Sequence, residues 1–180
     1  MSAALVLDID GTLDTADRKQ VERLVNYTDN HGVQRYINTA RSQEYCRDPD
    51  PLTTEIAGPK SHGKHHCLID PDPPTSKVIN MDKIRKRERI DDARCLVLID
   101  DRPENIEAVQ EAGYSGILVK ERRGIRKKTV NKAQRIMRRC LADQKTRGKC
   151  NDDSDFIRRL LTRIVIIIGI LFLFALLVNT

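Results

Sequence analysis

The sequence lacks the closely spaced cysteine pairs of a disulfide-stabilised protein. It contains five cysteines, an odd number with irregular spacing: Cys46, Cys67, Cys95, Cys140 and Cys150. Such a set is a poor disulfide framework. We therefore expect free thiols and a reducing compartment, the cytosol or the nucleus. The first residues also lack the basic and apolar regions of a cleaved secretory signal, so we expect no such signal.

Negative charge is scarce in one part of the chain. Residues 120–163 hold 16 Lys and Arg against 5 Asp and Glu, whereas residues 1–119 hold 16 against 21. This asymmetry suggests contact with an anionic surface. No aromatic residue lies in the basic stretch Lys120–Lys149, so stacking on nucleic-acid bases is unsupported. We favour an anionic lipid surface over a solvated helix face or nucleic acid.

Polar side chains are absent from Ile164 to Val178. Counted from Leu160, with Arg163 reaching the interface, the apolar run approaches the roughly 20 residues that a membrane span requires. The run is apolar on every face, unlike an amphipathic helix. We expect a globular domain over residues 1–143, a linker over 144–159 and a transmembrane helix over 160–178. Basic residues precede the helix, so we expect a single-pass C-terminal anchor with the domain on the cytosolic side.

Short apolar runs alternate with segments of helical spacing in the globular part. We expect strands over residues 4–9, 33–38, 94–99 and 115–119, and helices over 17–30, 78–89, 103–113 and 124–143. We expect residues 42–76 to form a long loop with short elements such as residues 66–69. This alternation predicts an α/β fold, a Rossmann-like three-layer sandwich around a mostly parallel sheet.

Acidic residues follow two of the expected strands. Asp8 and Asp10 close the first, where two residues at i and i+2 point the same way on an extended chain. Asp100 and Asp101 close the third expected strand. Ligands bind beyond the carboxyl ends of parallel strands, so we expect one strongly negative site there. Oxygen ligands of this kind suit Mg²⁺, which would in turn attract a phosphate group.

The motifs in this order resemble those of the haloacid dehalogenase-like superfamily. Asp8-Ile9-Asp10-Gly11-Thr12 is similar to its motif I, and the strand ending at Thr39 resembles motif II. Thr75-Ser76-Lys77, opening a helix, resembles motif III, and Ile99-Asp100-Asp101 with Asn105 resembles motif IV. The resemblance covers about residues 3–142. It implies a magnesium-dependent phosphatase that acts on phosphomonoesters of proteins or small molecules.

The resemblance also assigns a role to each matching residue. Asp8 would attack phosphorus and form an aspartyl-phosphate, and Asp10 would act as general acid and base. Thr39 and Lys77 would bind the phosphoryl group. Mg²⁺ would be held by Asp8, the Asp10 carbonyl and Asp101, with Asp101 favoured over Asp100. Asn105 stands where many members carry a further aspartate.

Several alternatives stay open at this point. Lys60 and Lys83 rival Lys77, and a zinc site built on His62, His65, His66 and Cys67 is the less favoured reading of that cluster. Both gaps that hold cap domains in the family are short, so we expect a minimal cap and an open site. The other functions to weigh are a catalytically inactive, membrane-tethered scaffold and a nucleic-acid 3′-phosphatase.

Overall fold

The computed structural model describes residues 3–47 and 67–143. Within them lies one five-stranded sheet in which every neighbouring pair of strands is parallel, in the order β3-β2-β1-β4-β5. The fold is therefore α/β with an all-parallel sheet, as expected of a Rossmann-like architecture. The strands are β1 (Ala4–Leu7), β2 (Gln34–Thr39), β3 (Cys67–Ile69), β4 (Leu96–Asp100) and β5 (Ser115–Leu118).

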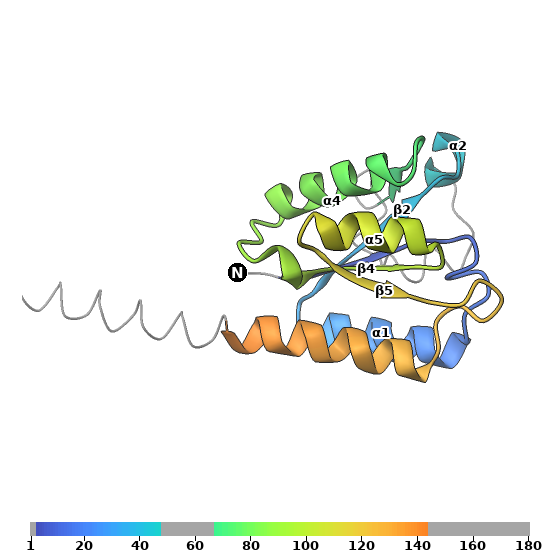
Figure 1. Cartoon of the computed structure of the whole chain (residues 1–180). Helices are drawn as coiled ribbons and strands as arrows, with labels where there is room; N and C mark the ends of the chain where they lie inside the picture. Colours follow the sequence, from blue (N-terminus) through green and yellow to red (C-terminus); the bar gives the residue numbers. More distant parts are fainter. Residues whose placement is uncertain (1–2, 48–66, 144–180) are drawn as a thin grey trace, which may run out of the picture. The chain divides into compact units, whose positions relative to one another are not determined.

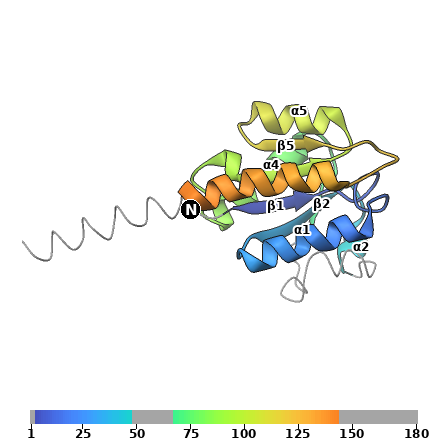
Figure 2. The ribbon, with the colours of Figure 1, turned by 90° about the horizontal axis from the view of Figure 1, so that it is seen from below.

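Helices cover both faces of the sheet and complete a three-layer arrangement (Figure 1). On one face lie α4 (Thr75–Arg87) and α5 (Pro103–Glu111). On the other, α1 (Arg18–Asn30) runs alongside a helix over residues 127–143, as Figures 1 and 2 both show. The Tyr27 hydroxyl of α1 donates to the Gln134 carbonyl of that helix at 3.4 Å, which links the two.

Burial explains why these segments take these forms. All residues of β1 and β4 are buried, as expected for central parallel strands covered on both faces. In α1, Val21, Leu24 and Thr28 recur at helical spacing and are all buried. The chain then turns at Gly32, whose φ of +65° favours glycine, and enters β2.

The expected elements agree with the observed ones to within a few residues. The main difference lies in the expected loop over residues 42–76, which contains α2 (Gln43–Arg47), β3 and the first turn of α4. A 3-10 helix, η2 (Ala93–Cys95), also precedes β4, where we expected strand. Strand β3 has only three residues, too few for a periodic pattern.

The register of the sheet brings the strand ends together at one edge. Leu7 of β1 pairs with Ile37 on one side and Ile99 on the other. The ladder continues one step further, because the Asp8 N–H donates to the Ile99 carbonyl at 3.0 Å. Asp8 and Asp100 therefore leave the sheet side by side, at its carboxyl edge.

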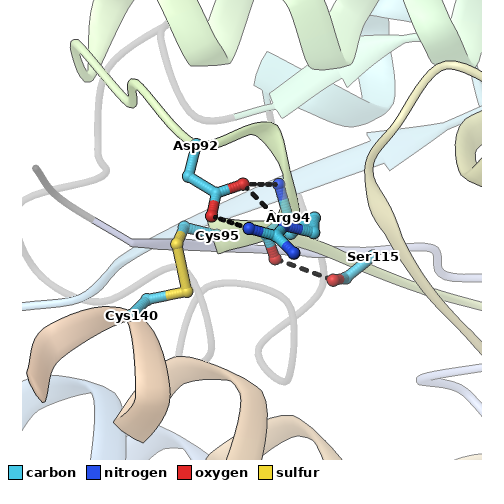
Figure 3. Close-up of a disulfide and its surroundings, with 5 residues drawn as sticks. All are labelled: Asp92, Arg94, Cys95, Ser115 and Cys140. Carbon is cyan, nitrogen blue, oxygen red and sulfur yellow. Dashed lines mark hydrogen bonds and ion pairs between the residues drawn. A yellow bond between two sulfur atoms is a disulfide. The ribbon is translucent and has the colours of Figure 1, made fainter. Parts of the chain in front are cut away.

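Four of the five cysteines form disulfides, so our expectation of free thiols was wrong for them. Cys46 bonds to Cys67, 21 residues later, and Cys95 bonds to Cys140, 45 residues later. Neither pair is close in sequence; the fold brings each together. Figure 3 shows the second pair joining η2 to the helix over residues 127–143.

Polar contacts anchor η2 beside this disulfide. The Asp92 carboxylate accepts from the Arg94 backbone N–H at 3.0 Å and pairs with the Arg94 guanidinium at 2.8 Å (Figure 3). The Ser115 hydroxyl, at the start of β5, donates to the Arg94 carbonyl at 2.7 Å. The turn that carries Cys95 is thus fixed to the sheet independently of the disulfide.

The chain divides into two compact units, Met1–Leu141 and Ala142–Thr180. All but the first two residues of the second unit lie outside the described ranges, as does the expected transmembrane helix over 160–178. No helix within the described ranges is sufficiently long and apolar to cross a bilayer. The expected division into a domain, a linker and an anchor stays a prediction.

Candidate active site

A buried lysine lies at the carboxyl edge of the sheet. Lys77, in the first turn of α4, is only 1% exposed. Its ammonium group donates to the Asn38 carbonyl at 2.6 Å. It also forms ion pairs with three carboxylates: Asp8 at 2.7 Å, Asp100 at 3.0 Å and Asp70 at 3.5 Å. A buried charge requires such pairing, so Lys77 and these carboxylates form one electrostatic unit.

The ionisation of this unit reflects a surplus of acid. Burial raises the pKa of Asp8 to about 7, against the opposing effect of Lys77, and Asp100 raises it further. Burial by itself lowers the pKa of Lys77, but the Asp8 and Asp100 carboxylates outweigh burial and raise it. One ammonium therefore neutralises only part of the negative charge gathered here.

Asp8, Asp100 and Asp101 form a group suited to a divalent cation. Each offers one carboxylate oxygen, and these oxygens lie within 4.8 Å of one another. Burial and the neighbouring Asp100 raise the pKa of Asp101, as expected of carboxylates that repel one another in the absence of a cation. Hard oxygen donors in an incompletely neutralised cluster fit Mg²⁺.

Asp100, which ends β4, and Asp101, which follows it, differ in how many of their carboxylate lone pairs already accept hydrogen bonds. The Asp100 oxygens accept from the Arg102 N–H at 2.9 Å and from Asn105 Nδ2 at 3.1 Å, besides pairing with Lys77. Asp101 is less buried, and within residues 3–47 and 67–143 its carboxylate has no such hydrogen bond or ion pair with another residue. Asp101 is therefore better placed to bind a cation directly, and Asp100 to position its neighbours.

Gly11 allows the loop after β1 to lie against Asp101. A Cβ atom at this position would stand 2.2 Å from Asp101 Oδ2, far inside contact distance. Its φ of +72° also favours glycine. The loop and the Asp101 carboxylate thus approach one another as closely as backbone allows, which accounts for a glycine after Asp10.

Asp10 occupies a different position from the other acids. Its carboxylate accepts from Arg41 Nη2 at 2.6 Å and Nε at 3.0 Å, and its side chain is 59% exposed. The Arg41 guanidinium also lies over the Tyr45 ring, 4.5 Å from its centroid. The predicted metal ligand was the Asp10 carbonyl, and its carboxylate is outside the group formed by Asp8, Asp100 and Asp101.

Thr39 ends β2 at the same edge and is fully buried. Its hydroxyl oxygen accepts from the Arg41 backbone N–H at 3.2 Å, so the hydroxyl proton can be directed to another acceptor. The fold therefore brings Asp8, Thr39, Lys77, Asp100 and Asp101 to one edge of the sheet, with Asp10 paired to Arg41 on its exposed side.

Two asparagines hold α4 against the strand ends. Asn80 Nδ2 donates to Asn38 Oδ1 at 3.0 Å and to the Ile69 carbonyl at 2.8 Å. Asn38 Nδ2 in turn donates to the Lys77 carbonyl at 3.4 Å. Both asparagines are buried. These bonds fix the first turns of α4 and, with them, the position of the Lys77 ammonium.

The sequence reading missed Asp70. This fully buried residue follows β3, and its N–H donates to the Thr39 carbonyl at 2.7 Å. The Ser76 hydroxyl donates to Asp70 Oδ1, while Oδ2 faces Lys77. The signal in the sequence is an acid directly after the short apolar run Cys67-Leu68-Ile69, which a strand of three residues makes weak.

The residues considered as alternatives to Lys77, or as zinc ligands, take no part in this site within the described ranges. Lys83 donates to Asn80 Oδ1 at 3.2 Å and takes no part in the carboxylate cluster. Lys60 and the three histidines considered for zinc lie outside the described residues. Cys67, the cysteine considered for zinc, is bonded to Cys46 and therefore offers no thiolate to a metal ion.

Comparisons with known proteins do not assign a family. No family model matches the chain, and no curated protein matches it. Among solved structures, an uncharacterized protein from Corynebacterium glutamicum ATCC 13032 Kitasato is similar, with a TM-score of 0.49 and 18% sequence identity. The match covers 67% of this chain and 86% of the other. A likeness at this level says nothing about activity.

Proposed function

We propose that this chain is a magnesium-dependent phosphomonoester hydrolase of the haloacid dehalogenase-like type. The observation that carries the proposal is the joint position of Lys77 and the Asp8, Asp100 and Asp101 carboxylates at one sheet edge. A solvated acidic turn would not require a buried lysine. A site for transferring a phosphoryl group requires both a cation-binding face and a positive side chain beside the nucleophile.

Asp8 is the proposed nucleophile. Its side chain is held by the 2.7 Å bond to Lys77, which orients the carboxylate and stabilises its ionised form. An Asp8 oxygen forms a bond to phosphorus while the ester P–O bond breaks, leaving an aspartyl-phosphate. Asp10 donates its proton to the departing ester oxygen.

Hydrolysis of the aspartyl-phosphate completes the cycle. Asp10, now a carboxylate, accepts a proton from water as the water oxygen bonds to phosphorus. The bond between phosphorus and the Asp8 oxygen breaks, which releases phosphate and regenerates the Asp8 carboxylate. For either proton transfer, Arg41 must release Asp10 from the ion pair described above, and a substrate phosphate is an alternative partner for that guanidinium.

Asp8 and Asp101 are the side chains proposed to hold Mg²⁺, with the Asp10 carbonyl as a third ligand. When bound, the ion supplies positive charge that attracts the phosphate and offsets the charge on its oxygens. Thr39 and Lys77 bind the phosphoryl oxygens on the other side. Asp100 raises the pKa of Lys77 and so favours its protonated form, and the ion pairs with Asp100 and Asp70 hold the ammonium in place.

We further propose that residues 160–178 anchor this domain to a membrane and that it faces the cytosol. This part of the proposal rests on the apolar run and on the basic residues before it. The substrate is a phosphomonoester on a protein or a small molecule. Nucleic acid is not favoured, because no aromatic residue is available in the basic stretch for stacking.

The proposal is tested by phosphate release from an aryl phosphate by the full chain in non-ionic detergent. We expect activity with Mg²⁺ and its loss in EDTA. Asp8→Asn replaces the proposed nucleophilic carboxylate by an amide and should lower kcat by about a thousandfold or more. Asp91→Asn, at an exposed turn away from the site, is the matched control and should retain activity.

Two results would count against the proposal. Equal rates for Asp8→Asn and the unaltered chain would exclude Asp8 as nucleophile. Binding of Mg²⁺, measured by calorimetry, with no turnover on a panel of phosphomonoesters would favour the inactive scaffold instead. Loss of activity in Asp91→Asn would indicate general instability, which a thermal unfolding scan of both variants would show.

A further inference from the structure

A groove lined by basic residues runs beside β5, at the edge of the sheet. It has a volume of about 390 Å³ and lies between the end of β5 and the start of the helix over residues 127–143. A second hollow, of about 600 Å³, continues along that helix and shares Lys128 and Lys132 with the first. The first groove includes five basic residues: Lys120, Arg123, Arg126, Lys128 and Lys132.

These basic groups are not neutralised by the part of the protein that surrounds them. Across residues 3–47 and 67–143, none of the five is in an ion pair with a carboxylate. Elsewhere on the same domain, Arg35, Arg41 and Arg94 do have such pairs. A concave surface that gathers charge of one sign concentrates the field and attracts ligands of the opposite sign.

One wall of the groove is the outer edge of β5, which is free only around Leu118, because the Gly124 N–H donates to the Lys120 carbonyl at 2.9 Å just beyond it. Strand β5 is the last in the sheet order, and its only strand partner in the described chain is β4. The Val119 N–H donates to the Asp100 carbonyl at 2.9 Å, so the backbone groups of Leu118, one residue earlier, point away from β4. Gln110 caps the Gly116 carbonyl at 3.2 Å, but Leu118 is 51% exposed.

Proteins usually cover or blunt such an edge, because its backbone groups readily pair with another chain. Here the edge is flanked by lysines and arginines, which oppose pairing with a second copy of the same basic surface. An extended segment with acidic side chains can both pair with the strand edge and neutralise the basic residues beside it. Its backbone pairs with β5, and its carboxylates reach the lysines of the opposite wall.

We infer that this groove binds an acidic peptide segment of a partner protein, added to β5 as an extended strand. The concave shape and the strand edge favour a peptide over a flat membrane surface. The residues that line the groove include no aromatic side chain, which disfavours single-stranded nucleic acid. The exposed Leu118 provides an apolar contact for alternate side chains of the bound strand.

The groove is connected to the candidate active site through the turn after β5. The Thr15 hydroxyl donates to the Glu121 carbonyl at 3.0 Å, and the Ile125 N–H donates to the Thr12 carbonyl at 3.3 Å. A strand added to β5 therefore ends next to the loop that carries Asp8 and Asp10. Binding itself does not depend on the proposed hydrolysis, so Asp8→Asn should bind the peptide like the unaltered chain.

The test is binding of a fluorescent peptide of about ten residues, alternating glutamate and valine, to the full chain in non-ionic detergent. We expect saturable binding that weakens as salt is raised. Lys128→Glu with Lys132→Glu should weaken it by about tenfold or more. Lys19→Glu with Lys86→Glu, exposed positions on other helices, makes the same charge change and should weaken it about twofold or less.

A change in the peptide tests strand pairing without altering the protein. Methylation of alternate backbone nitrogens on the edge that pairs with β5 keeps every charge but removes those N–H donors, so binding should fall by about tenfold or more. Equal binding of the methylated peptide would overturn strand addition. The inference would also fail if the Lys128/Lys132 variant lost binding to phosphatidylserine vesicles or duplex DNA while the acidic peptide bound neither protein.

Discussion

At the scale of single residues, Asp8 is the group whose ionisation depends most visibly on the fold. Its pKa is about 7 in the folded protein, compared with 3.8 ordinarily. Between pH 3.8 and about pH 7, Asp8 therefore keeps its proton in the folded state, whereas it has released that proton in the unfolded chain. A raised carboxyl pKa contributes stability at low pH, and this contribution is lost as pH rises towards the folded value.

We expect this loss to appear as a difference between the unaltered chain and Asp8→Asn. With EDTA present, the free energy of unfolding of the unaltered chain should fall relative to the variant between about pH 4 and pH 7, by at most about 1.4 kcal/mol per pH unit. Urea unfolding across this range measures it. Asp91→Asn, compared in the same way, should show no such trend, and a flat difference for Asp8→Asn would contradict the pKa.

Residue identities were partly predictable from the sequence. Asp8 and Asp101 were predicted because each follows a clear strand, and Lys77 because Thr75-Ser76-Lys77 resembles a family motif. Asp70 and Asn80 were not, because their roles depend on contacts between β3, β2 and α4. A three-residue strand gives no periodic signal, and an asparagine inside a helix looks like an ordinary polar residue.

At the scale of elements, alternating strands and helices predicted the parallel sheet and its helical layers. The strands with long buried runs, β1 and β4, were the easiest to predict, because central parallel strands read as continuous apolar segments. The short elements α2 and β3 were placed in a loop. The cysteine pairs were missed because partners 21 and 45 residues apart meet only once the sheet has formed.

The disulfide between Cys95 and Cys140 should stabilise the attachment of the C-terminal helix of the domain. Cross-linking positions 45 residues apart restricts the unfolded chain, so Cys140→Ser should lower the free energy of unfolding by about 2 to 4 kcal/mol. Denaturant unfolding without reductant measures the loss. With reductant, the variant and the unaltered chain should unfold at nearly the same denaturant concentration.

A direct assay accompanies this measurement. The unaltered chain, unfolded without reductant and treated with an alkylating reagent, should remain unmodified at Cys95 and Cys140 when its peptides are weighed by mass spectrometry. Alkylation of both thiols would contradict the cross-link. Disulfides persist mainly in oxidising compartments, so these two bonds weigh against the reducing surroundings that the cysteine count suggested.

At the scale of the whole molecule, two parts of the sequence carry net charges of opposite sign. Residues 1–119 carry a small excess of acid, whereas residues 120–163 are strongly basic and precede an apolar run. The sheet concentrates acid at its carboxyl edge, and the groove beside β5 gathers the basic residues. One domain thus presents an acidic cluster at one edge of its sheet and a basic surface beside β5.

Membrane attachment is the prediction that belongs to this scale. Removing residues 160–180 should move the protein from the membrane pellet to the supernatant after carbonate extraction, because the removed run is long enough to hold a chain in a bilayer. The matched control replaces the same residues with a known transmembrane segment and should restore the pellet. Recovery of the shortened chain in the pellet would contradict anchoring by this run.

The same preparation tests orientation. Basic residues before the run predict a domain on the cytosolic face, so protease added to intact vesicles with that face outward should digest it. Protection of the domain would place it on the opposite side. That outcome would agree with its two disulfides and would move the proposed activity to an oxidising space.

The single ammonium of Lys77, shared by three carboxylates, has a consequence for how such a sequence can diverge. Replacement of Lys77 alone would leave Asp8, Asp70 and Asp100 as unpaired, mutually repelling carboxylates in the interior of the protein. Replacement of Asp70 alone removes only the most distant of the three partners of Lys77. Evolutionary change at this centre should therefore begin at Asp70. Related sequences that lack Lys77 should also have lost at least one of its three acidic partners, by a substitution that came first.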